Sequence, residues 1–111
     1  MAYKMNERGR KVLDKWDKIY KKEAEMLKRE YKEDEADGIH HRQKLDEFVK
    51  DYACERTSEN VFSLEDEVGY YVWYYGDKLP NLIEDDSVFM WDDKKQKNEA
   101  IKMAMGFYKK E

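Results

Sequence analysis

The amino-acid sequence predicts an all-α fold of about four helices, in which a long N-terminal helical hairpin is followed by two shorter helices. Apolar residues recur at the three- and four-residue spacing of a helix in four separate segments. Only five glycines and one proline are available for turns, which disfavours a many-stranded fold. The 111 residues suit one ordinary domain and contain no interior linker, so we expect a single helical domain over residues 1–111.

The first two segments form the predicted hairpin. The first helix is expected over about Glu7–Ala36, because Asn6 can cap its start and an apolar stripe follows one side. Gly38 can adopt the left-handed backbone that ends a helix. A short connection there would fold a second helix, over about Ile39–Glu55, antiparallel to the first. Residues 56–60 are polar and are expected to form a loop.

The third segment carries signals for both a helix and a strand. Ser63 can cap a helix, Asp66 follows it at capping-box spacing, and Gly76 can end the helix. The valines and aromatic residues between them favour a strand instead. We expect the helix, because the caps satisfy specific backbone groups. The alternative is an α+β fold with a small sheet from residues 61–75 and 87–91.

One further helix is predicted after the third segment. Residues 77–92 contain an acidic run and the short apolar stretch Val88–Trp91, which we expect to pack on the core in an extended form. Asp92 or Asp93 is expected to cap a last helix that ends at about Lys109.

Charge is distributed unevenly along the chain, although the net charge is only −4. Residues 1–32 carry 11 basic and 6 acidic residues, and residues 94–111 carry 6 basic and 2 acidic residues. The stretch between them, residues 33–93, is the acidic block: it carries 5 basic and 18 acidic residues. Such asymmetry indicates interaction surfaces of opposite sign. The competing interpretation is that the acidic block only contacts the basic ends of its own chain.

Residues that could carry catalysis or bind a metal are sparse. The five glycines are scattered, so the sequence has no phosphate-binding loop. Cys54 lies too far along a shared helix from His40 or His41 to pair with either as nucleophile and base. The adjacent histidines point apart, and we expect both to be solvated. We therefore predict a non-enzymatic protein with no catalytic residue, no metal site and no cofactor.

The composition indicates a cytoplasmic protein without a membrane partner. The sequence has no apolar run long enough to span a bilayer, and its N-terminus lacks the apolar region of a secretory signal. Cys54 is the one cysteine, which excludes an internal disulfide framework and fits a reducing compartment.

The third segment offers the strongest candidate for a binding surface. Three aromatic residues lie opposite its apolar side when it is drawn as a helix, and large rigid rings are typical anchors of protein interfaces. Carboxylates around them would steer a protein partner that has a basic surface. The competing interpretation is that this helix is central and its rings belong to the core. The predicted partner-binding residues are Tyr70, Trp73, Tyr74, Glu65, Asp66, Glu67, Glu84, Asp85 and Asp86.

The acidic block also suggests what such a partner does. Eighteen carboxylates within residues 33–93 could imitate the phosphates of a nucleic acid. A small acidic helical protein without catalytic residues has the profile of a phage or mobile-element inhibitor. The leading hypothesis is therefore a protein-binding module that blocks a basic, nucleic-acid-handling surface of its partner.

The alternative hypothesis is a nucleic-acid-binding regulator. Five basic residues follow helical spacing along one side of the first helix, where a cationic ridge could track phosphates. Acidic neighbours interrupt this ridge, and no known DNA-reading motif accompanies it. The residues of the ridge are Lys11, Lys15, Lys18, Lys22 and Arg29.

Overall fold

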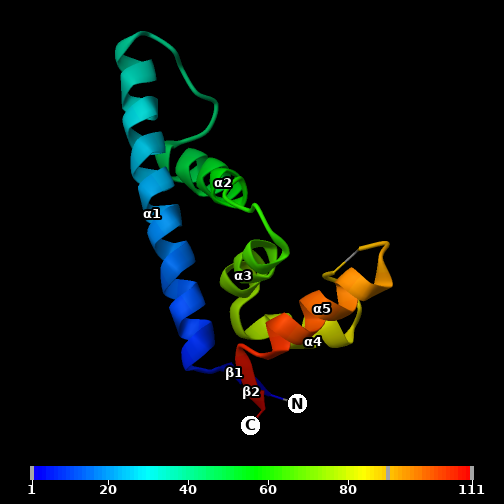
Figure 1. Ribbon diagram of the computed structural model, residues 1–111. Coiled ribbons are helices and arrows are strands. Elements are labelled where there is room, and N and C mark those ends of the chain that lie inside the picture. Colours follow the sequence, from blue (N-terminus) through cyan, green and yellow to red (C-terminus); the bar gives the residue numbers. More distant parts are fainter. Residues whose placement is uncertain (1, 90, 111) are drawn as a thin grey trace. The chain divides into compact units, whose positions relative to one another are not determined.

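A computed structural model describes residues 2–89 and 91–110, and it confirms the all-α prediction (Figure 1). Within these residues, four helices have twelve or more residues and a fifth has six. The helices are α1 (Glu7–Ala36), α2 (Leu45–Ser58), α3 (Leu64–Tyr75), α4 (Leu79–Glu84) and α5 (Lys94–Met105), with a 3-10 turn, η1 (Gly76–Lys78). Two short strands complete the fold, β1 (Tyr3–Met5) and β2 (Tyr108–Lys110).

The chain divides into two compact units. Unit 1 consists of Met1–Trp16 and Val61–Glu111, and unit 2 consists of Asp17–Asn60. The core of unit 1 brings together the buried side chains of α3, α5 and the segments around them. Unit 2 has a smaller core of its own between the second half of α1 and α2, formed by Ala24, Leu27, Val49 and Ala53.

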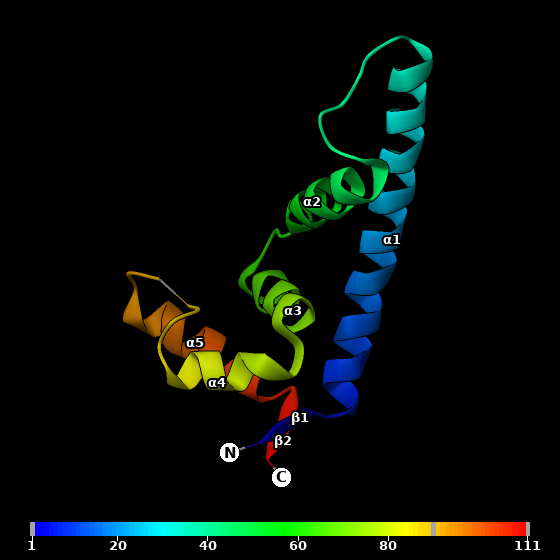
Figure 2. The same ribbon diagram turned by 180° about the vertical axis from the view of Figure 1, so that it is seen from behind.

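The two ends of the described chain pair as the only sheet seen in it (Figures 1 and 2). β1 and β2 are antiparallel, with Met5 opposite Tyr108. Gly9 permits this approach, because a Cβ there would lie 2.5 Å from the carbonyl oxygen of Phe107. The Asn6 side chain accepts a bond from the Gly9 amide at 3.0 Å, so the predicted cap of α1 is confirmed. The sheet itself was not predicted, since it joins opposite ends of the sequence.

The segment with mixed signals is a helix, and the alternative sheet from residues 61–75 and 87–91 is wrong. Ser63 Oγ accepts a bond from the Asp66 amide at 3.1 Å, as predicted. The Asp66 carboxylate accepts from the Phe62 amide at 3.3 Å rather than from that of the cap residue. Gly76 ends α3 with φ +60°, a conformation that favours glycine. The predicted capping groups are thus in place, and the segment is helical despite the strand propensity of the residues between.

Two boundaries in the last third of the chain differ from the prediction. η1 and α4 were not expected, and Pro80 lies in the first turn of α4, where a missing amide costs little. Asp93 caps α5 as predicted, accepting from the Lys95 amide at 2.9 Å. The helix ends at Met105 rather than at about Lys109, because the following residues pair with β1. Val88 and Phe89 pack on the core as expected, while Met90 lies outside the described residues.

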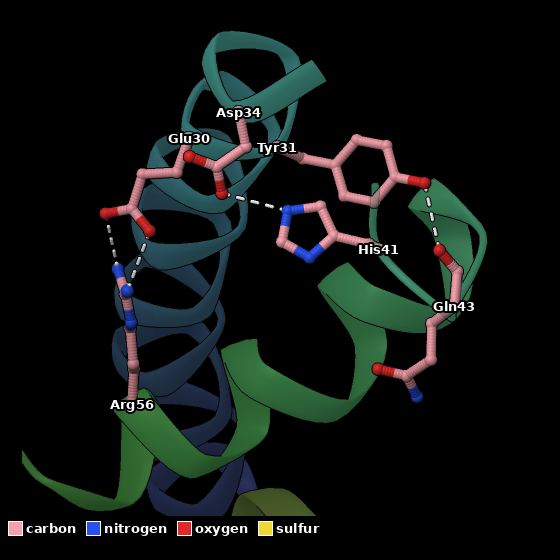
Figure 3. A network of polar contacts seen from close by, with 6 residues as sticks. All are labelled: Glu30, Tyr31, Asp34, His41, Gln43 and Arg56. Carbon is pink, nitrogen blue, oxygen red and sulfur yellow. Dashed lines mark hydrogen bonds and ion pairs between the residues drawn. The ribbon is translucent and has the colours of Figure 1, made fainter. Parts of the chain in front are cut away.

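The second helix begins at Leu45, later than the predicted start at Ile39. The backbone before it is held to α1 by side chains: Tyr31 donates its hydroxyl to the Gln43 carbonyl at 2.9 Å (Figure 3). The helix also continues to Ser58. Of residues 56–60, which were predicted to form a loop, only Glu59 and Asn60 lie outside the helix. The buried Thr57 donates its hydroxyl to the Ala53 carbonyl at 2.6 Å, which satisfies this polar group inside the helix.

Candidate protein-binding surface

A connected group of tyrosines covers one side of α3 in unit 1. Tyr70 stacks on Tyr74 with ring centroids 6.0 Å apart, and Tyr71 stacks on Tyr75 at 5.9 Å. The two stacked pairs meet edge to face, at 6.1 Å between Tyr70 and Tyr71 and at 4.9 Å between Tyr74 and Tyr75. We call these four residues the tyrosine quartet. Within the quartet each ring contacts two others, so the four rings form one continuous cluster.

The quartet has an inner edge against the core and an outer edge in solvent. Trp16 of α1 is 1% exposed, and its ring meets Tyr70 edge to face at 5.8 Å. Gly69 makes room for that indole, since a Cβ at this position would lie 2.7 Å from Trp16 Nε1. Tyr74, in contrast, is 55% exposed. The helix thus anchors the quartet on one side and presents it on the other.

The three aromatic residues predicted from the sequence lie together, but in different environments. Tyr74 is exposed, whereas Tyr70 and Trp73 are half-buried and contact each other at 5.8 Å. Two further members of the quartet, Tyr71 and Tyr75, were not among the predicted binding residues and are half-buried. Of the three, only Tyr74 is exposed, and the fold partly covers Tyr70 and Trp73.

Two predicted carboxylates, Asp66 and Glu67, flank this surface at its N-terminal end. Helical spacing places Asp66 on the side of Trp73 and Glu67 on the side of Tyr74. Asp66 forms an ion pair with Lys15 of α1 at 3.7 Å. Glu67 is half-buried, and burial raises the pKa of its carboxyl group. Among residues 2–89 and 91–110, the side-chain carboxylate of Glu67 has neither an ion-pair nor a hydrogen-bond partner.

The other predicted carboxylates lie elsewhere in unit 1. Glu65 lines a hollow of about 190 Å³ with Arg8, Val68, Met103 and Phe107, on a different side of α3 from Tyr74. The remaining three stand at the end of α4. There Glu84 accepts a bond from the Tyr3 hydroxyl at 2.6 Å, Asp86 pairs with Lys97, and Asp85 is exposed at the helix end.

Folding redistributes the charge blocks of the sequence. Unit 1 combines 12 basic with 13 acidic residues, and unit 2 combines 10 basic with 13 acidic residues. The ion pairs Asp66–Lys15 and Asp86–Lys97 each join the acidic block to one of the basic ends. A nucleic-acid mimic is therefore less well supported by charge than the sequence suggests, and the aromatic surface becomes the stronger feature.

All five cations of the predicted nucleic-acid-binding ridge are exposed on α1. Lys15 is engaged, however: it pairs with Asp66, and its ammonium group lies 5.9 Å from the centroid of the Trp16 ring. The ridge is thus partly neutralised by the helix that carries the tyrosine quartet. The other members, Lys11, Lys18, Lys22 and Arg29, extend into solvent.

Unit 2 contains a polar and aromatic cluster that the sequence did not reveal (Figure 3). His41 was expected to be solvated, like His40, but it is half-buried. Its ring stacks on Tyr31 at 4.7 Å and contacts Phe48 at 4.7 Å, and its Nε2 lies 2.9 Å from Asp34 Oδ2. These contacts form because the backbone of residues 37–44 brings His41 back to α1, and no local sequence pattern predicts that conformation.

Other chemistry is sparse in the described part of the chain. Cys54 is half-buried, and burial raises the pKa of its thiol, which lowers its reactivity at neutral pH. Residues 2–89 and 91–110 hold no group of three or more histidine, cysteine, aspartate or glutamate side chains that could bind a metal ion. Within the same ranges, no helix combines the length and apolarity that crossing a bilayer requires.

Comparison with known proteins adds no relative to this description. No protein-family model matches the chain, and no significant match was found among curated proteins or solved structures.

Proposed function

We propose that this chain is a non-enzymatic protein-binding module that contacts its partner through the tyrosine quartet and Trp73. The observation that carries this proposal is the exposure of Tyr74 at the edge of an anchored aromatic group. A ring that is already held in place loses little conformational entropy when a partner covers it. Aromatic residues of this kind dominate the binding energy of many protein interfaces.

The charges around the quartet favour a partner with a basic surface. Glu67 carries an unpaired negative charge beside the rings, and Asp66 is only partly neutralised at a 3.7 Å separation from Lys15. Both would attract a cationic surface at long range and raise the association rate. The narrower hypothesis, that the partner uses this basic surface to handle nucleic acid, predicts that nucleic acid and the chain compete for it.

Site-specific photo-crosslinking tests the proposal. A photoreactive phenylalanine analogue at position 74 should capture a defined partner in the cell that produces the chain. Tyr52 is the matched control, because it is also an exposed tyrosine, at 43%, and its ring is also packed on a neighbour, Phe48, at 4.8 Å. The partner should crosslink from position 74 and not from position 52, and Tyr74→Ala should abolish its co-purification. Equal crosslinking from both positions, or none from either, would contradict the proposal.

A second candidate function rests on the exposed cations of α1. Lys11, Lys18, Lys22 and Arg29 would bind nucleic acid through phosphates, with an affinity that falls steeply as salt increases. A gel-shift assay at low salt with duplex DNA and with RNA tests this function. The absence of a shift with either would eliminate it.

A further inference from the structure

We propose that Glu67 and the tyrosine quartet form a subsite for an arginine side chain of the partner. This inference rests on the proposed function and specifies its chemistry. An arginine guanidinium is flat and can stack on a tyrosine ring while its donors bind a carboxylate. The surface of α3 supplies both components within two turns of one helix.

The first component is the arrangement of the four rings. The rings of Tyr70 and Tyr74 are inclined by 25°, and those of Tyr71 and Tyr75 by 24°. The two pairs meet at 62° and at 79°, so they form two nearly perpendicular columns along the helix. Aromatic faces arranged around a corner are typical of sites that bind organic cations. Tyr74 is exposed at the C-terminal end of the columns, so the aliphatic stem of the arginine can lie on this ring while its guanidinium extends toward the N-terminal end.

The second component is the carboxylate of Glu67, which lies at the N-terminal end of both columns. It precedes Tyr70 by three residues and Tyr71 by four, and residues at these spacings are neighbours on a helix surface. Burial raises the pKa of the Tyr71 hydroxyl, and the negative charge of Glu67 raises it further. A half-buried carboxylate without a cation is unfavourable in the free protein, and a bound guanidinium would compensate it.

The neighbouring carboxylate shows the same chemistry already satisfied within the chain. Lys15 pairs with Asp66 and lies 5.9 Å from the Trp16 ring centroid, so one cation there contacts both a carboxylate and an aromatic ring. Glu67 and the quartet likewise place a carboxylate beside aromatic rings, but no lysine or arginine of the described chain pairs with Glu67. We choose arginine over lysine because its planar fork can stack and make two hydrogen bonds at once.

The test uses the full-length chain and three short peptides. Each peptide has one central residue between glycines, with blocked ends: arginine, lysine or the neutral arginine analogue citrulline. Binding is followed by two-dimensional NMR of the isotope-labelled chain. The arginine peptide should shift the amide signals of residues 67–75 with a millimolar Kd. The lysine peptide should bind less tightly and the citrulline peptide about tenfold less tightly, because the guanidinium charge is lost.

Two substitutions identify the residues involved. Glu67→Gln, which keeps the shape of the side chain, and Tyr74→Leu should each weaken binding of the arginine peptide by about tenfold. Glu65→Gln is the matched control on another side of the same helix, and it should leave binding unchanged. Equal binding of the arginine and citrulline peptides, or unchanged binding by Glu67→Gln, would overturn the arginine subsite.

The subsite and the proposed function can fail independently. If position 74 captures a partner whose affinity does not depend on Glu67, the module stands and the subsite is wrong. If the arginine peptide binds as expected but position 74 captures no partner, the subsite stands and the proposed function is wrong. Equal binding of the lysine peptide would overturn the preference for arginine.

Discussion

The two units of this chain are stabilised by different kinds of contact. Among the described residues, the buried apolar cluster of unit 1 has nine members and that of unit 2 has four. Unit 2 supplements its small cluster with polar and stacked side chains, including a two-bond ion pair in which Arg56 donates to Glu30. Unit 1 has a larger core and, in addition, an aromatic surface that its core does not fully cover. The stability of unit 2 should therefore depend more on each single contact than the stability of unit 1 does.

The largest effect is expected from Leu27→Ala in unit 2. Leu27 is 1% exposed and is the largest member of the four-residue cluster, so its truncation should cost about 3 kcal/mol. Hydrogen exchange should then accelerate across Asp17–Asn60 while α3 stays protected. The converse variant is Leu79→Ala, which removes an equally buried leucine from unit 1. If each variant accelerated hydrogen exchange equally in both units, the units would unfold as one cooperative domain, and they would not differ in how they are stabilised.

A smaller effect is expected from His41→Ala, which removes two ring contacts and the bond to Asp34. The loss should be about 1–2 kcal/mol, because the cluster is only half-buried. Hydrogen exchange should increase mainly in residues 39–44. The adjacent His40→Ala is the control, since His40 is exposed and its replacement should change neither quantity. Equal effects of the two variants would mean that the His41 cluster does not stabilise unit 2.

Helix ends that carry a local capping signal were predicted correctly. Asn6 and Ser63 were identified as caps from residue type and spacing, and Asp93 was one of two candidates for the last helix; each accepts a backbone hydrogen bond. These groups act within one helical turn, so the sequence carries the information directly. Asn6 and Gly38 likewise predicted the two ends of α1.

Contacts between distant residues were not predictable in this way. β1 and β2 pair across almost the whole sequence, and His41 meets Tyr31 only because of the path of the intervening chain. The same limit applies to the candidate site. Its aromatic residues were found from helical spacing, but the absence of a partner for Glu67 depends on which cations the fold brings near.

Ser63→Ala should have the next smaller effect on the free energy of unfolding, because the buried side chains of α3 also hold this helix on the core of unit 1. Loss of the cap should cost about 1 kcal/mol, measured by chemical denaturation. Ser63→Thr keeps the hydroxyl and should recover most of that free energy. A loss of 3 kcal/mol or more would show that the cap is the main determinant of helix over strand in this segment, since a typical cap contributes roughly 1 kcal/mol.

The smallest expected effect separates stability from binding at Glu67. Because burial raises the pKa of this carboxyl group in the folded chain, the folded state binds its proton more tightly than the unfolded state does. Stability from this group is therefore present at acidic pH and is lost as the pH rises through the raised pKa. Glu67→Gln should remove that pH dependence and leave stability at pH 7 unchanged or higher by a few tenths of a kcal/mol. Denaturation of both chains at pH 4 and pH 7 measures the difference. A clear loss of stability at pH 7 would mean that Glu67 serves the fold; no loss, with weaker arginine binding, would mean that a carboxylate unfavourable to unit 1 is kept there for a partner.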